Sequence, residues 1–164
     1  MAYLVMKVFM MSSNNDYAKQ WNESYIRGEN NILYPQSEVI RFLNKFVAKR
    51  LSMDETNYLL KQSRTVRRCL DFGCGVGTHA QTCEDFGLVG YGIDISAEAI
   101  SRAQNYAREN DKPELADGFQ LLSSYPVLLP FENNFFDVCI AESCLDSMSF
   151  EDAKLWLQEI FRCT

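Results

Sequence analysis

The spacing of apolar residues changes near residue 67 of the chain. From that point, short apolar runs alternate with helical stretches of about a dozen residues, a pattern typical of successive strand–helix units on a parallel sheet. The pattern predicts strands over residues 68–72, 88–94, 119–123 and 136–141. We therefore expect an α/β fold with a parallel sheet and flanking helices.

The helices predicted between and after these strands carry recognisable end signals. Gly87 is the expected terminator of the first, and Ser96 caps a second that runs to about Asn110. Ser149 and Asp152 form a capping-box pattern that opens the last helix. The buried stripe of this last helix is predicted to hold Ala153, Trp156, Leu157, Ile160 and Phe161.

The residues before position 67 differ in composition and in the spacing of their apolar positions. Residues 12–36 are polar and aromatic without a sustained helical or strand period, which indicates an ordered cover or a flexible lid. Ser37 can cap a helix, and residues 51–66 permit a short weak helix before a connector. The apolar face of the helix after Ser37 is predicted to hold Val39, Ile40, Phe42, Leu43, Phe46 and Val47. We divide the chain into an N-terminal extension with lid and helix, residues 1–66, and a core, residues 67–164.

Composition and charge narrow the classes of function. Of the 164 residues 47% are apolar and 23% are charged, which supplies enough apolar material for a globular core. The chain has 16 basic and 22 acidic residues, and its net charge of −6 opposes attraction to nucleic acid phosphates. No apolar run approaches the roughly 20 residues that span a bilayer. Neither a nucleic acid nor a membrane is an expected partner.

The six cysteines and the one histidine do not form a metal-binding pattern. The cysteines contain no C-x-x-C pair, and several stand among apolar residues as reduced core cysteines do. The apolar residues 1–11 lack the basic region and the cleavage site of a signal peptide. We therefore expect a cytoplasmic protein with no bound metal.

The segment LDFGCGVG, residues 70–77, is the most informative one for chemistry. Its three glycines lie at a strand-to-helix turn, where missing side chains let a ligand approach the main chain. A dinucleotide fingerprint would place its last glycine at position 78, which is Thr78, and would not usually carry an acid at Asp71. A carboxylate there suits an ammonium or hydroxyl group and repels a pyrophosphate.

A second acid, Asp94, ends the second predicted strand seventeen residues after Gly77. An acid at this place in the topology accepts hydrogen bonds from ribose hydroxyls. Together with Asp71 it indicates a ligand with a cationic amino acid end and a ribose, whose base lies against Ile95.

These features resemble the class I S-adenosylmethionine-dependent methyltransferases, whose first motif is an acid followed by G-x-G-x-G. The similarity runs from about Trp21 to the end of the chain and includes YGIDIS at residues 91–96. It also includes LPFENNFFDVCIAES at residues 129–143, which is similar to the L-P-F-x-x-x-x-F-D segment before the fourth strand of the family. The resemblance implies a Rossmann-like sheet and S-adenosylmethionine as the cofactor.

The resemblance also implies roles for individual residues. The expected cofactor-binding residues are Trp21, Tyr25, Asp71, Gly73, Cys74, Gly75, Gly77, Asp94, Ile95, Ser124 and Ala141. The N-terminal aromatic residues are expected to cover the cofactor. Asp71 and the glycines hold the methionine part, and Asp94 holds the ribose. The segment after the third strand has no acid, which leaves Ser123, Ser124 or Tyr125 for the adenine amino group.

Methyl transfer from a sulfonium needs alignment and exclusion of water more than a general base. Glu142 and Asp146 are the candidate catalytic residues, with the role of orienting the acceptor. Because the chain lacks the Asn-Pro-Pro-Tyr type motif of enzymes that methylate base amines, we expect a small molecule or a protein side chain as acceptor.

The family sheet has seven strands, and the pattern predicts four before Thr164. The expected fold is therefore truncated after the fourth strand and its following helix. Its fourth strand would form an exposed apolar edge, and such edges pair with other chains. The partner expected at this edge is a second copy, in a homodimer, or a missing C-terminal half.

Two other functions fit the same residues. One is a catalytically idle module that binds S-adenosylmethionine and works through a partner. The other is an oxidoreductase that uses a nicotinamide cofactor. Methyl transfer to an acceptor would exclude the first, and preferential binding of a dinucleotide would favour the second.

Overall fold

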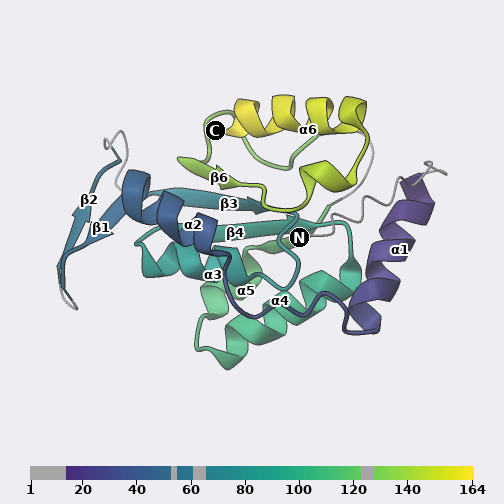
Figure 1. Cartoon of the computed structure of the whole chain (residues 1–164), viewed down its shortest axis with the longest axis horizontal. Helices are drawn as coiled ribbons and strands as arrows, with labels where there is room; N and C mark the ends of the chain where they lie inside the picture. The colour runs from purple at the N-terminus through teal and green to yellow at the C-terminus, as the bar shows by residue number, and fades with distance from the viewer. Residues whose placement is uncertain (1–13, 53–54, 61–65, 123–127) are drawn as a thin grey trace, which may run out of the picture.

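The computed structural model describes residues 14–52, 55–60, 66–122 and 128–164. In these parts of the chain, four strands form a parallel sheet in the order β5–β4–β3–β6 (Figure 1). The strands are β3 (Arg68–Phe72), β4 (Val89–Asp94), β5 (Phe119–Leu121) and β6 (Val138–Ile140). The α/β class and the parallel sheet predicted from the sequence are confirmed.

Helices cover both faces of the sheet (Figure 1). One face carries α3 (Thr78–Asp85), α4 (Ala97–Glu109) and α5 (Pro113–Asp117), and the other carries α6 (Phe150–Cys163). Side chains of the central strand β3 point alternately to the two faces of the sheet. Cys69 packs with Cys83 of α3, whereas Leu70 and Phe72 pack with Trp156 of α6. Because it is covered on both sides, β3 is buried from Cys69 to Phe72, including the charged Asp71.

The N-terminal elements surround this core at its rim. The helix α1 (Asn14–Ile26) packs beside α4, and α2 (Ser37–Phe42) continues into a π-helical turn, η1 (Leu43–Val47). A short antiparallel hairpin of β1 (Ala48–Arg50) and β2 (Thr56–Tyr58) protrudes from the side of the molecule (Figure 1).

Several end signals that the sequence predicts are confirmed. The Ser96 hydroxyl oxygen accepts a hydrogen bond from the Ala99 N–H at 3.1 Å, and Ser149 does the same for Asp152 at the start of α6. Gly87 ends the α3 region with φ +75°, a conformation that glycine adopts without strain. The four predicted strands agree with the observed ones to within a few residues at their ends.

Two predictions of local structure are wrong, and one short helix was missed. Residues 12–36 contain the helix α1, because aromatic residues spaced by four positions supply its packing stripe in place of aliphatic ones. Residues 51–66 contain β2, because pairing with β1 overrides a weak local pattern. The short helix α5, which begins at Pro113, was not predicted from the pattern.

The predicted buried faces of two helices are too broad. The stripe spaced by four residues, Val39, Leu43 and Val47, is buried in the described core. The adjacent predicted residues Ile40, Phe42 and Phe46 are exposed. In α6 the buried stripe is Trp156, Ile160 and Cys163, while Leu157 and Phe161 are exposed. One residue of offset rotates a side chain by about 100° around a helix, so these neighbours face solvent.

The strand β6 pairs with β3 and forms one border of the sheet in the described residues. Its Val138 and Ile140 are buried against Val39 and Leu43 of the α2–η1 segment. None of the helices that the structure describes has the length and apolarity needed to cross a membrane.

Candidate functional site

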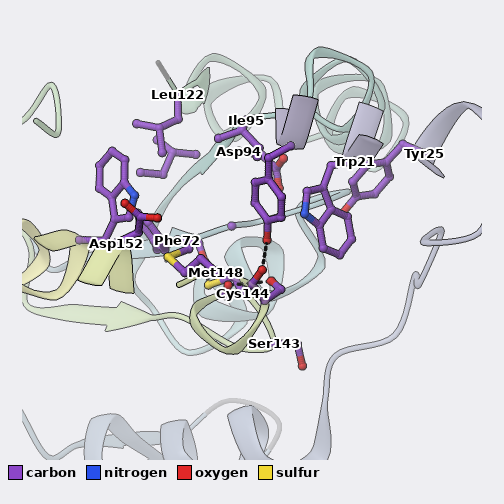
Figure 2. A pocket seen from close by; sticks show the side chains of 15 residues that line it. Trp21, Tyr25, Phe72, Asp94, Ile95, Leu122, Ser143, Cys144, Met148 and Asp152 are labelled. Carbon is purple, nitrogen blue, oxygen red and sulfur yellow. Dashed lines mark hydrogen bonds between the residues drawn. The ribbon is translucent and has the colours of Figure 1, made fainter. Parts of the chain in front are cut away.

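A cavity opens at the carboxyl ends of β3, β4 and β5 (Figure 2). Its volume, which includes space open to solvent, is about 890 Å³. The wall consists of Tyr17, Trp21, Tyr25, Phe72, Gly73, Ile93, Asp94, Ile95, Leu122, Ser143, Cys144, Ser147, Met148, Asp152 and Trp156. Ligands of open parallel sheets bind outside the carboxyl ends of the strands, so this is the candidate site.

The glycine-rich turn after β3 is packed closely by neighbouring side chains. Gly73, Gly75 and Gly77 have φ values of +73°, +53° and +81°. A Cβ on Gly73 would lie 2.6 Å from the Cβ of Cys144, and one on Gly75 would lie 2.6 Å from the Tyr25 hydroxyl. Of the three, Gly73 lines the cavity. The positive φ values and the close neighbours therefore leave no room for a side chain at Gly73 or Gly75.

Asp94 is held in place by the backbone of its surroundings. One carboxylate oxygen accepts a hydrogen bond from the Gly75 N–H at 2.9 Å, and the other accepts from the Ser96 N–H at 2.8 Å. Burial raises the pKa of Asp94, and these hydrogen bonds counteract the rise. Each carboxylate oxygen accepts more than one hydrogen bond, so Asp94 retains capacity for hydroxyl groups in the cavity.

Asp71 lies beneath the turn and does not line the cavity. It is 1% exposed, and one of its oxygens accepts a hydrogen bond from the Ala80 N–H at 3.2 Å. The other oxygen, Oδ1, is buried without a hydrogen-bond partner among the described residues. Burial raises the pKa of Asp71 to about 7, and the charges of Asp94 and Glu142 add to the rise.

His79 stands beside Asp71 at the start of α3. Its Nδ1 is 3.9 Å from Asp71 Oδ1, and its Nε2 accepts a hydrogen bond from the Gln36 N–H at 3.2 Å. An imidazole that accepts at Nε2 carries its proton on Nδ1 when neutral, so the proton faces Asp71. Burial lowers the pKa of His79, which favours this neutral form.

The helix α1 covers the cavity through one stripe of aromatic residues. Tyr17, Trp21 and Tyr25 recur every four residues and all line the cavity; Figure 2 labels Trp21 and Tyr25. The Tyr17 hydroxyl donates a hydrogen bond to the Ser147 carbonyl. The Asn22 Oδ1 accepts hydrogen bonds from the Glu98 N–H at 2.8 Å and the Ser96 hydroxyl at 3.1 Å. Asn22 thus attaches α1 to the N-terminus of α4.

The structure brings some of the predicted site residues together. Trp21, Tyr25, Gly73, Asp94 and Ile95 line the cavity. The predicted residues that do not line it are Asp71, Cys74, Gly75, Gly77, Ala141, Glu142 and Asp146. Ser124 lies outside the described residues.

Sequence reasoning missed most of the wall opposite α1. Cys144, Ser147 and Met148 come from the loop after β6, and Asp152 and Trp156 come from α6. No local signal in the sequence places these residues against Asp94. Tyr17 was also missed, although its spacing of four from Trp21 is a helical signal.

The part of the chain described by the structure contains no group of three or more histidine, cysteine or acidic residues arranged to hold a metal ion. All six cysteines are free thiols.

Comparisons with known proteins identify the family and the fold of the chain. Residues 70–164 match a family model described as methyltransferase domain. The S-adenosylmethionine-dependent methyltransferase structure from Methanosarcina mazei is 27% identical, with a TM-score of 0.51, over 61% of this chain and 48% of that one. A protein described as an S-adenosylmethionine-dependent methyltransferase from Methanococcus maripaludis shares the fold, with a TM-score of 0.55 and 18% identity, over 96% of this chain and 62% of that one.

A curated relative from Haemophilus influenzae, an uncharacterised protein, is 29% identical over 97 residues. The match covers 58% of this chain and 38% of the relative. The chain thus spans between 38% and 62% of the length of these three relatives.

Proposed function

The chain belongs to the methyltransferase domain family, and from this premise we propose that its cavity binds S-adenosylmethionine for transfer of the methyl group to an acceptor. The observation that carries the proposal is the placement of Asp94 at the end of β4, hydrogen-bonded to the glycine-rich turn of β3. This arrangement offers a fixed carboxylate to a ribose and a main-chain cradle to an aminoacyl tail.

Asp94 would hold the ribose hydroxyl groups, and Ile95 would contact the base. Both residues line the cavity, and Asp94 is oriented by the N–H groups of Gly75 and Ser96 before any ligand arrives. A carboxylate fixed in this way loses little conformational entropy on binding, which favours affinity.

Asp71 acts on the methionine end through its charge. Because the side chain is buried beneath the turn and outside the cavity wall, its effect on a ligand ammonium is a field effect across the turn. Its unpartnered Oδ1 fits a site that is completed when a cation is nearby. Gly73 is the residue of the turn that lines the cavity, and Cys74, Gly75 and Gly77 would contribute through the shape of the turn behind it.

The bound cofactor supplies a methyl group activated by a sulfonium, so the chain needs to orient the reactants and exclude water. The aromatic residues Tyr17, Trp21 and Tyr25 perform the exclusion by covering the cavity. The loop after β6 reaches the cavity through Ser143 and Cys144, which would lie near the reacting end, whereas Ala141 and Glu142 do not line the cavity. Glu142 and Asp146 remain the proposed residues that orient a small-molecule or protein acceptor.

The experiment that tests the proposal is titration calorimetry with S-adenosylhomocysteine. Asp94→Ala should weaken binding about ten- to a hundredfold, because charge-assisted hydrogen bonds are lost. Asp117→Ala, which removes an exposed acid of α5, is the matched control and should bind as the parent chain does. Equal affinities of the parent chain and the Asp94 variant would contradict the proposal.

Asp94 also stabilises the glycine turn, so a second comparison separates binding from folding. The 2′-deoxyribose analogue of S-adenosylhomocysteine should bind the parent chain more weakly, whereas Asp94→Ala should not distinguish the two ligands. Transfer of a labelled methyl group to a pool of small molecules and proteins then distinguishes an enzyme from an idle binding module.

A further inference from the structure

We propose that His79 of α3 is a positioning residue, which directs its Nδ1–H toward the buried Asp71 and holds that carboxyl group in the charged form that attracts the cationic end of the cofactor. The inference rests on the proposed function and deepens it. It gives a role to an imidazole that does not line the cavity and that the transfer of the methyl group does not otherwise use.

The main chain before α2 fixes the protonation of His79. The Gln36 N–H donates a hydrogen bond to His79 Nε2 at 3.2 Å. A ring nitrogen that accepts this hydrogen bond has no proton of its own, so the neutral ring carries its proton on Nδ1. A second proton, on Nε2, would set two N–H groups against each other and would break the hydrogen bond from Gln36. This contact therefore selects a neutral imidazole with one donor, at Nδ1.

The nearest oxygen to this donor is the one that lacks a partner in Asp71. Asp71 Oδ2 accepts a hydrogen bond from the Ala80 N–H at 3.2 Å, whereas Oδ1 is buried without a hydrogen-bond partner among the described residues. His79 Nδ1 lies 3.9 Å from this Oδ1. The separation exceeds a hydrogen bond by about 1 Å, and hydrogen bonds of ligand-free sites often shorten when a ligand binds. The two groups are thus placed to pair when the cavity is occupied.

The charges around Asp71 oppose its ionisation. Burial is the main cause that raises the pKa of Asp71 to about 7, and the charges of Asp94 in β4 and of Glu142 after β6 contribute to the rise. Glu142 is also the charged group that acts on His79. The other ionisable groups near Asp71 stay uncharged at neutral pH because burial raises their pKa values; they are the thiols of Cys69, Cys74, Cys139 and Cys144 and the Tyr25 hydroxyl. An N–H donor at Oδ1 favours the charged carboxyl group against these effects.

A small shift in the pKa of Asp71 has a large effect on its charge. A group whose pKa lies near 7 is only partly ionised at neutral pH. Loss of one hydrogen-bond donor to a carboxylate should raise its pKa by about one unit, which at pH 7 lowers the charged fraction from about one half to about one tenth. His79 therefore determines how much of the chain has a charged Asp71 at neutral pH.

The test uses two variants, each of which keeps one of the two nitrogen positions of His79. In His79→Gln the terminal amide reaches the place of Nε2, and its oxygen accepts from the Gln36 N–H, but no donor replaces Nδ1. In His79→Asn the amide nitrogen takes the place of Nδ1, and the Gln36 contact is lost. Titration calorimetry with S-adenosylhomocysteine between pH 6 and pH 9 should show an affinity that rises with pH. The midpoint of this rise should move up by about one pH unit in His79→Gln and by less than about 0.3 unit in His79→Asn.

Thermal unfolding of the ligand-free chain makes the same comparison without a cofactor. The pKa of Asp71 is higher in the folded chain than its ordinary value, so its contribution to stability falls as the pH rises toward the folded pKa. A still higher pKa in His79→Gln extends this fall, and the loss of melting temperature between pH 5 and pH 9 should exceed that of the parent chain and of His79→Asn. In a chain that carries Asp71→Asn, the further substitution His79→Gln should leave both pH profiles unchanged, because the group on which His79 acts is then missing.

Two results would overturn the role of His79 while leaving the cofactor site intact. One is the same midpoint in His79→Gln and the parent chain. The other is a shift in His79→Asn that equals or exceeds the shift in His79→Gln, which would mean that the ring serves to hold residue 36. Failure of the parent chain to bind S-adenosylhomocysteine at any of these pH values would overturn the proposed function, and the unfolding profiles would still decide whether His79 acts on Asp71.

Discussion

The two sides of the cavity are built by different means. The floor, formed by the carboxyl ends of β3 and β4 with the glycine-rich turn, places its acids in the core: Asp71 is 1% exposed and Asp94 8%. The roof, formed by α1, is attached by one hydrogen bond from Tyr17 and two that Asn22 accepts, and by the packing of Trp21 and Tyr25 against Val76 and Ala99. Changes in the floor should therefore alter folding and binding together, whereas changes in the roof should alter binding with little effect on folding.

The difference also concerns charge. The floor buries carboxyl groups whose pKa values are raised by desolvation, a cost that the fold bears in the absence of a cationic ligand. The cavity side of the roof consists of the rings of Tyr17, Trp21 and Tyr25, which exclude water without burying a charge. The buried carboxyl groups of the floor thus favour a cationic ligand, and the aromatic rings of the roof keep water away from that ligand.

The largest expected effect is a difference in the free energy of unfolding between substitutions at Gly77, in the floor, and Gly28, which follows the roof helix α1. Gly77 and Gly28 have similar φ values, +81° and +77°. A Cβ on Gly77 would overlap the buried Phe119 ring and lie 3.1 Å from the Cβ of Ala103, whereas one on Gly28 would meet nothing within 4 Å. Gly77→Ala should lower the free energy of unfolding by about 2–4 kcal/mol, and Gly28→Ala by about 1 kcal/mol.

Urea denaturation of both variants measures this difference. Equal losses would mean that backbone conformation alone determines the cost, and that the floor is no more tightly packed than the roof.

The next effect concerns the buried Asp71. Its pKa in the folded chain, about 7, exceeds the ordinary value of 3.8, so its contribution to stability is greatest below pH 4 and is lost as the pH rises through 7. Asp71→Asn, which is never charged, should therefore stabilise the ligand-free chain by about 1–4 kcal/mol at pH 8 and by less at pH 5. Thermal unfolding at the two pH values measures the effect.

The same substitution should have the opposite effect on binding. Because the charged carboxylate attracts the ligand ammonium, affinity of the parent chain for S-adenosylhomocysteine should rise from pH 6 to pH 8, and Asp71→Asn should flatten this profile. A variant that is less stable at pH 8, or one that keeps the parent pH profile, would refute the role of this charge.

The smallest effect tests the roof. Asn22→Ala removes the acceptor for Ser96 and Glu98 and should weaken S-adenosylhomocysteine binding about three- to tenfold, while Tyr17→Phe should weaken it less. The melting temperature should change by no more than about 2 °C if α1 acts as a detachable cover. Gln20→Ala, an exposed position of the same helix, is the control. A large loss of stability in Asn22→Ala would show that the roof belongs to the core.

The floor of the cavity could be predicted from the sequence better than the roof and the opposite wall. The floor follows from signals within a few residues of one another, such as the apolar run of β3, the glycines after it and the cap at Ser96, so its elements were predicted correctly. The aromatic residues Trp21 and Tyr25 were also placed at the site, although their helix was not recognised.

The wall opposite the roof could not be predicted, for a physical reason. Trp156 was predicted to be a core residue, and its place beside the cavity depends on how α6 crosses the sheet. Asp152 has a local role as part of a helix cap, and nothing in that role indicates that it also faces a cavity. Contacts of this kind arise from long-range packing, which local patterns do not record.

The most direct test of the central claim is a crystal structure of the chain with S-adenosylhomocysteine. The account predicts that the ribose hydroxyl groups lie within hydrogen-bond distance of Asp94, with the amino acid end over the turn at Gly73 and the base toward Leu122. A ligand bound elsewhere, or one whose ribose makes no contact with Asp94, would contradict it.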